Sequence, residues 1–170
     1  MKTKMMMICL VLGSWAAKAQ HDHAKHGDDK KMNQNMVMFK DAKLGEAYGH
    51  YLHLKDALVA SKTDGAKNAA TELQTALKGV SGSAASIELA AKITNLSDLD
   101  GQRKIFGALS NEMTTLVKGG KLSMGMLYLE YCPMANNNTG AYWLSNEKEI
   151  KNPYFGDKML KCGSVKEMIH

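Results

Sequence analysis

The stretch SDLDGQRKIFGALSNEMTTLVKGG, residues 97–120, is the most clearly marked helix of the sequence. Its first four residues, 97–100, resemble a capping box with aspartate in place of the usual glutamate, and two glycines end it. Between these ends, apolar residues recur at helical spacing, as in a helix with one buried face. They are Leu99, Phe106, Leu109, Met113 and Leu116. This stretch predicts a mainly α-helical fold.

Arg103 lies on the same stripe as the apolar residues of this helix. A guanidinium without partners is costly to bury, so we expect it to bond to other parts of the chain. We predict a structural role, in which Arg103 ties its helix to the C-terminal segment. Met113 is expected to pack in the core, and its sulfur is also a weak candidate for a metal ligand.

Three further helices are predicted before this one, near residues 43–62, 64–78 and 84–94. Each shows apolar or small residues at helical spacing, and glycine- or serine-containing turns separate them. Short connections favour antiparallel neighbours. The sequence therefore predicts a four-helix up-and-down bundle.

After the helices, the pattern changes to short strands and turns. Residues 122–131, LSMGMLYLEY, favour a strand, and residues 141–144, AYWL, can pair with it across the turn-forming NNNTG at 136–140. A short helix near 157–161 and a last strand over 165–169 complete the segment. We expect a small C-terminal β-hairpin and an irregular cap against the bundle.

The first 19 residues have the three parts of a secretory signal peptide, with predicted cleavage after Ala19. Residues 20–38 form a His- and Met-rich tail, and residues 39–170 form the helical domain. The signal carries three of the 22 Lys and Arg, and the acids number 17, so the mature charge is 19 minus 17, or +2. This small charge gives no reason to expect nucleic acid binding, and the mature chain is predicted not to insert into a membrane.

Several histidines are candidate metal ligands. The tail places His21, His23 and His26 within six residues, where they can converge on one ion or remain solvated. His50 and His53 can share one face of the first helix. For this second pair we favour exposed side chains without a function over a shared ion.

Two sulfur-containing pairs flank the C-terminal cap: Cys132 with Met134, and Met159 with Cys162. Two thiolates with one or two thioethers would suit a soft ion such as Cu(I) or Ag(I), and Zn(II) less well. The alternative is a disulfide between the two cysteines, which is common in exported proteins and would close a loop of about thirty residues. Spacing alone favours the disulfide.

Catalysis is the weakest of the hypotheses for this chain. The sequence has no phosphate loop, no paired-carboxylate motif and no HExxH. We therefore expect a binding protein and not an enzyme.

Four segments resemble one exported bacterial family, the domain of unknown function "thirty-three forty-seven". They are YLHLKDALVAS at 51–61, QRKIFGALS at 102–110, YCPMANNNTGAYWLS at 131–145 and NPYFGDKMLKCG at 152–163. The likeness extends from about Phe39 to the C-terminus. The family occurs alone or fused to periplasmic adaptor subunits of heavy-metal efflux pumps.

This resemblance implies a periplasmic protein that handles copper or silver, with an efflux adaptor or another envelope protein as a possible partner. Cys132-Pro133-Met134 also resembles the start of small heavy-metal-binding domains in the same pumps. Ala135 stands where those domains have histidine, and their second cysteine pair is absent. The resemblance favours a metal site at the cysteines; the alternative is a disulfide-stapled interaction domain.

Overall fold

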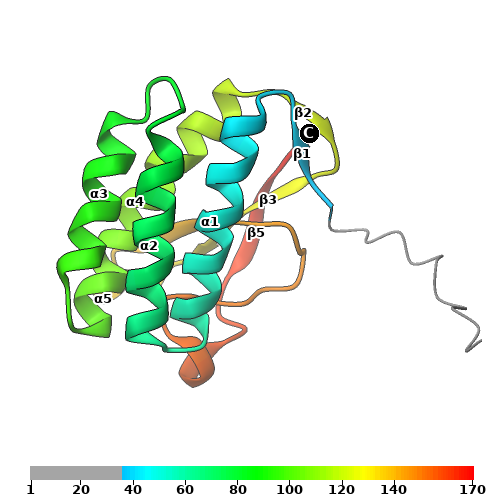
Figure 1. Cartoon of the computed structure of the whole chain (residues 1–170). Helices are drawn as coiled ribbons and strands as arrows, with labels where there is room; N and C mark the ends of the chain where they lie inside the picture. Colours follow the sequence, from blue (N-terminus) through cyan, green and yellow to red (C-terminus); the bar gives the residue numbers. More distant parts are fainter. Residues whose placement is uncertain (1–35) are drawn as a thin grey trace, which may run out of the picture. The chain divides into compact units, whose positions relative to one another are not determined.

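The computed structural model describes residues 36–170, and its main feature is a bundle of four helices (Figure 1). Each helix packs on the next along the chain, and the first also contacts the fourth. They are α1 (Ala42–Val59), α2 (Thr63–Leu77), α3 (Ala84–Asn95) and α4 (Leu99–Gly119). The predicted up-and-down bundle is confirmed.

The start of α4 shows how the sequence sets a helix end. Asp98 is the cap, and its Oδ1 accepts the backbone N–H of Gly101 at 2.7 Å. This cap lies one residue later than the predicted capping box, which would use the side chain of Ser97. A carboxylate at this position also stabilises the positive end of the helix dipole.

A three-stranded antiparallel sheet follows the bundle, with strand order β4-β3-β5. The strands are β3 (Leu127–Cys132), β4 (Ala141–Ser145) and β5 (Ser164–Ile169). The predicted hairpin is β3 with β4, and β5 is the predicted last strand. Two short helical elements connect these strands: the turn of helix α5 (Ala135–Asn138) and the 3₁₀ helix η1 (Gly156–Met159).

The first part of the predicted long strand pairs elsewhere. Residues of β2 (Leu122–Met124) join β1 (Met38–Phe39) in a separate two-stranded ribbon. Gly125, with φ of +87°, separates β2 from β3. The ribbon thus begins one residue before the predicted start of the domain at residue 39.

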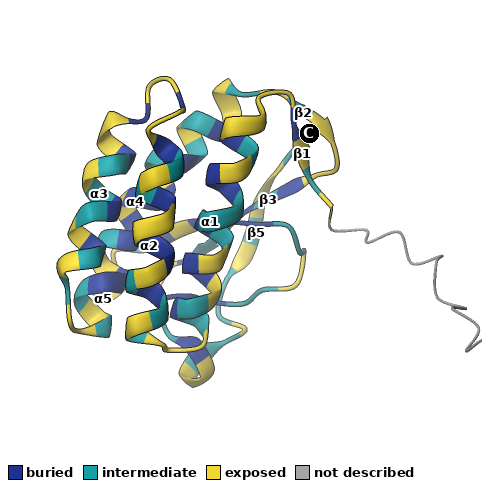
Figure 2. Cartoon of the chain, viewed as in Figure 1, coloured by how far each residue is buried: buried dark blue, intermediate teal, exposed yellow. Residues whose placement is uncertain are grey.

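The core lies between the inner faces of the helices and the sheet, as the dark bands in Figure 2 show. Tyr51 of α1 joins three elements at its centre. Its hydroxyl bonds to Ser110 Oγ of α4 at 2.8 Å and accepts the N–H of Leu144 in β4 at 3.0 Å. Met113, with no exposed surface, packs in this core as predicted. The sheet is therefore fixed to the bundle by both packing and hydrogen bonds.

The turn between β3 and β4 uses left-handed backbone at four of its five residues, with Thr139 as the exception. Asn136, Asn137 and Asn138 have φ between 49° and 66°, and Gly140 has φ of +81°. Asparagine tolerates this conformation better than most residues because its short side chain can bond locally. The predicted NNNTG turn is confirmed.

Replacing Gly140 with alanine is expected to destabilise the protein by about 2 kcal/mol, because of left-handed strain and a steric clash. A Cβ at this position would lie 2.0 Å from the Tyr131 hydroxyl oxygen. Gly119→Ala is the matched control, because no atom lies within 4 Å of its added Cβ. Urea unfolding of both variants checks this, and equal stabilities would contradict it.

The signal peptide, the cleavage site and most of the tail, including His21, His23 and His26, lie outside the described residues. Within residues 36–170, the helices are too short or too polar to cross a bilayer.

Candidate functional site

The structure brings the two cysteines into direct contact. Cys132 Sγ and Cys162 Sγ lie 2.9 Å apart, although the residues are 30 positions apart in the chain. Cys132, the last residue of β3, is buried, and Cys162 follows η1 and is half-buried. Both are free thiols in this structure. One sulfur is therefore fixed in the core while the other is reachable from solvent.

A buried asparagine holds the Cys162 segment in place. Asn152 donates its side-chain amide to the Cys162 carbonyl at 2.7 Å and its backbone N–H to the Leu160 carbonyl at 2.9 Å. Its side-chain oxygen accepts the Tyr154 N–H at 2.8 Å. Asn152 has no exposed surface. This network closes the loop from the Pro153 turn back to Cys162, which positions the backbone around the second thiol.

The environment of the thiol pair favours the protonated form of Cys162. Its bond to Cys132, and to a lesser extent burial, raise its pKa from 9.0 to about 11. A thiol with such a pKa is a poor nucleophile at neutral pH, because the thiolate is the reactive form. An ion that binds the thiolates must displace these protons, so its affinity rises with pH.

The separation of 2.9 Å lies between two possible states of the pair. A disulfide bond needs about 2.05 Å, and an ion bound by both sulfurs at about 2.3 Å needs a separation of roughly 3.5 to 4.5 Å. Either state requires a shift of about 1 Å. Cys162 is the side chain that can move, because it is only half-buried.

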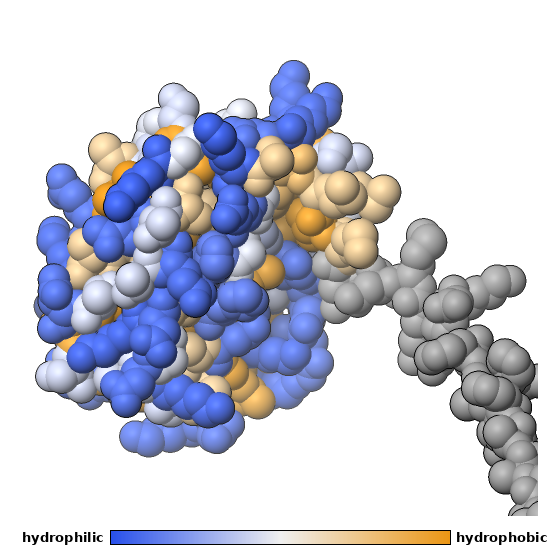
Figure 3. Space-filling view, in the orientation of Figure 1, coloured by the Kyte–Doolittle hydropathy of each residue, from blue (hydrophilic) through white to orange (hydrophobic). Residues whose placement is uncertain are grey.

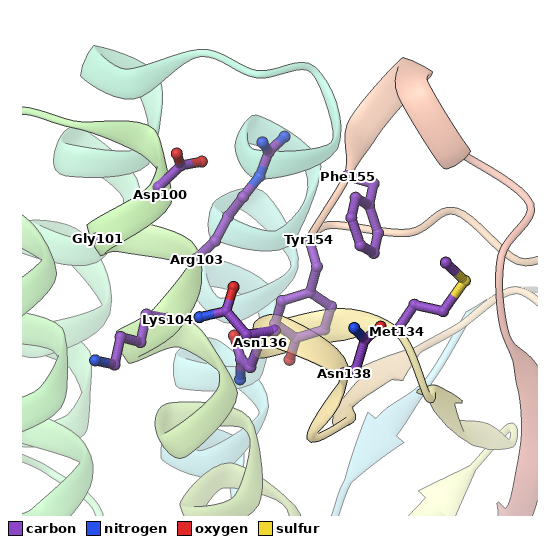
Figure 4. Close-up of a pocket in the computed structure, with 10 residues that line it drawn as sticks. Asp100, Gly101, Arg103, Lys104, Met134, Asn136, Asn138, Tyr154 and Phe155 are labelled. Carbon is purple, nitrogen blue, oxygen red and sulfur yellow. The ribbon is translucent and has the colours of Figure 1, made fainter.

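The two methionines predicted to complete the site occupy different surroundings. Met134 is exposed and lines an open hollow of about 590 Å³ together with Arg103, Asn136 and Tyr154. Figure 4 shows its side chain across this hollow from Asp100 and Lys104. Met159 is half-buried in η1, and its carbonyl accepts the Cys162 N–H at 3.0 Å. Met159 is thus joined to Cys162 through the backbone.

The structure adds a third candidate ligand to the histidine pair. Nδ1 of His50 lies 3.2 Å from a carboxylate oxygen of Glu72 on α2, and the His50 and His53 rings have centroids 5.9 Å apart. One ligand atom from each of the three residues lies within 4.8 Å of the others. This spacing could hold a borderline divalent ion, for which imidazole and carboxylate are suitable ligands. Glu72 was missed because nothing in the sequence shows which residue of α2 faces His50.

Arg103 has the structural role that its position on the stripe predicts. Its Nε donates to the Pro153 carbonyl at 2.9 Å, and one terminal nitrogen donates to the Leu58 carbonyl and to Ser61 Oγ, both at 3.0 Å. Burial lowers its pKa from the ordinary value. Arg103 thus joins α4 to the end of α1 and to the segment that leads to Cys162.

Sequence reasoning also missed a buried acid, Glu130 of β3. The residue has no exposed surface, and neither carboxyl oxygen has a hydrogen-bond partner among the described residues. Burial raises its pKa from 4.5 to about 8, against the opposing charge of Lys55. An acid in the run LYLEY was the available signal. Leu129 and Glu130 are neighbours in β3 and both are buried, so both faces of the strand are covered at this point.

One family profile matches the chain, that described as "Protein of unknown function (DUF3347)", over residues 47–125. The matched part contains His50, His53 and Arg103 and ends before both cysteines. No curated protein and no solved structure matches the chain. Residues 47–125 therefore match this family of unknown function, which is the family that the sequence resembles.

Proposed function

We propose that this protein binds a soft monovalent ion, Cu(I) or Ag(I), between Cys132 and Cys162. The observation that carries the proposal is the contact of the two thiols at 2.9 Å. Thiolates are the protein ligands best matched to soft ions. One sulfur is buried and one half-buried, so an ion can reach the pair from solvent and be shielded once bound.

The proposed role is buffering of the ion in the periplasm, or its delivery to an efflux system. Export is supported by the N-terminal sequence, and the efflux context by the family resemblance. Met134 and Met159 are proposed accessory ligands, which would require the Met134 side chain to turn from its hollow. Binding, and not catalysis, is the proposed activity.

A disulfide between the same residues is the second candidate, and the 2.9 Å contact favours it as well. In that state the pair would stabilise the C-terminal cap of an envelope protein-interaction domain. Closure of a loop of this length stabilises by roughly 3 to 4 kcal/mol. The two states exclude each other, because sulfurs in a disulfide cannot act as thiolate ligands.

Titration of the reduced chain from residue 20 onward with Cu(I), against a chromogenic Cu(I) chelator under anaerobic conditions, tests the proposal; this chain lacks Cys9 of the predicted signal peptide. We expect one tightly bound equivalent, which is lost in Cys162→Ser and in Cys132→Ser/Cys162→Ser. Affinity is expected to increase with pH up to about 11, because the Cys162 proton must leave. The single variant is informative because it changes a half-buried position and leaves the buried Cys132 intact.

A chain with His21, His23 and His26 replaced by asparagine is the control, and we expect it to keep the tight equivalent. Loss of binding in this control alone would assign the metal to the tail and contradict the proposal. Thiol counting on the protein as isolated from the periplasm tests the second candidate. Thiols that are locked in a disulfide, together with a tight Cu(I) equivalent that survives their removal, would favour the interaction domain.

A further inference from the structure

Most of the large hydrophobic side chains that are exposed in residues 36–170 are methionines. In the part of the chain that the structure describes, six of the seven large hydrophobic side chains that are exposed are methionines. Four of them come from two short sequences of the form M-x-M, Met36-Val37-Met38 and Met124-Gly125-Met126. The exposed fractions of these four side chains lie between 37% and 55%. Packing in the core does not explain their presence.

The fold places these two sequences side by side. Met38 of β1 pairs with Met124 of β2 in antiparallel register, and paired residues project on the same face with Cβ atoms about 5 Å apart. Gly125 lies against the backbone of Met36 and Val37, where an added Cβ would be only 2.3 Å from the Met36 carbonyl oxygen. Two M-x-M sequences far apart in the chain therefore meet in one ribbon.

The ribbon is held so that its methionines face outward. Burial alternates along the first strand: Met36 and Met38 are exposed, while Val37 and Phe39 pack inward on the core. The Phe39 ring lies 5.3 Å from the ring of Tyr48 in α1. Lys40 continues the pairing by donating its N–H to the Lys121 carbonyl at 2.8 Å. Figure 3 shows a group of apolar atoms gathered over this end of the molecule, beside β1 and β2.

We propose that the β1–β2 ribbon is a second soft-metal site, in which the thioethers of Met36, Met38, Met124 and Met126 bind Cu(I) or Ag(I). Thioethers are neutral, soft ligands that suit these ions and bind hard or borderline ions poorly. Unlike thiols, thioethers need no deprotonation, so binding at the ribbon is expected to be independent of pH where the methionines alone are ligands. The ribbon extends the proposed soft-metal function and does not require the thiol pair.

The test uses the chain from residue 20 onward, which lacks Cys9 of the predicted signal peptide, with Cys132→Ser/Cys162→Ser. It is labelled with ¹³C at the methionine methyl groups and titrated with Ag(I). We expect saturable shifts of the methyl signals of the four ribbon methionines. Met134 is exposed to a similar degree but lies in the hollow beside Arg103, and Met113 is buried, so neither signal should shift. Equal shifts at Met134, or none at the ribbon, would overturn the proposal.

Met38→Leu/Met124→Leu separates metal binding from an apolar docking surface, because leucine keeps the apolar character and removes only the sulfur. This variant should lose the shifts at Met36 and Met126 as well, while the control Met134→Leu keeps them. Unchanged Ag(I) binding by Met38→Leu/Met124→Leu would overturn the site. If the thiol-free chain does not fold, the same titration of the unsubstituted chain should show ribbon shifts after the thiols are saturated. The absence of those later shifts would contradict the ribbon alone and leave the thiol proposal intact.

Discussion

Replacing Arg103 with methionine is expected to lower the free energy of unfolding by about 3 kcal/mol. The change keeps an unbranched side chain in the core and removes the three hydrogen bonds that the guanidinium donates. The Leu58 carbonyl keeps the N–H of Ser61 as a partner at 3.1 Å. The Pro153 carbonyl loses the Arg103 donor, and an unsatisfied buried acceptor costs about 1 to 3 kcal/mol.

Lys104→Met is the matched control for this variant. Lys104 is the next residue of α4, is exposed and lines the same hollow, so its replacement should change stability by less than about 0.5 kcal/mol. Chemical unfolding followed by circular dichroism provides the measurement. Because Arg103 bonds to the segment that leads to Cys162, we also expect faster alkylation of that thiol in Arg103→Met. Equal stability of the two variants would show that Arg103 lies at the edge of the core without joining these segments.

Replacing Glu130 with glutamine is expected to stabilise the protein by about 3 to 5 kcal/mol at pH 9. The folded state holds the Glu130 proton up to a pKa of about 8, whereas the unfolded state releases it near 4.5. Between these values the folded state binds more protons, so stability falls as pH rises. The loss is complete above about pH 8, where the buried group is ionised in the folded state too.

Glutamine has a similar shape but does not ionise, so the stability of Glu130→Gln should lack this part of the pH dependence. The two proteins should be similarly stable near pH 4, below both pKa values. Glu88→Gln, at an exposed position of α3, is the control and should follow the unsubstituted chain at every pH. Unfolding curves of the three proteins, measured between pH 4 and 9, test this prediction. Parallel curves for Glu130→Gln and the unsubstituted chain would mean that Glu130 is not a buried acid.

Much of the fold could be predicted because it is set by local patterns. The end signals of α4, the left-handed turn at NNNTG and the position of Arg103 each follow from neighbouring residues. The structure confirms the helix order, the β3–β4 hairpin and the last strand. The N-cap of α4 is Asp98, one residue after the predicted Ser97. The two adjacent residues are both good N-cap residues, so the sequence alone did not distinguish them.

The parts of the site that were missed depend on contacts between distant segments. The pairing of Met38 with Met124 brings the strand before α1 against the strand after α4. No local sequence pattern indicates this contact. The approach of Glu72 to His50 depends on the rotation of α2 against α1. Glu130 is buried because both faces of β3 are covered there, by distant parts of the chain, and a pattern with one buried face does not predict this. In contrast, Cys132 and Cys162 could be recognised as one site, because they flank the same C-terminal cap and the predicted turns between them bring its two ends together.

X-ray absorption at the copper edge, on the chain from residue 20 onward loaded with one equivalent of Cu(I), tests the central claim most directly. Thiolates bind Cu(I) more tightly than thioethers or imidazoles, so the first equivalent should go to Cys132 and Cys162. We predict a first shell of at least two sulfur atoms at about 2.3 Å, which is lost in Cys162→Ser. A shell of nitrogen and oxygen alone, or a sulfur shell that is unchanged in Cys162→Ser, would contradict the account.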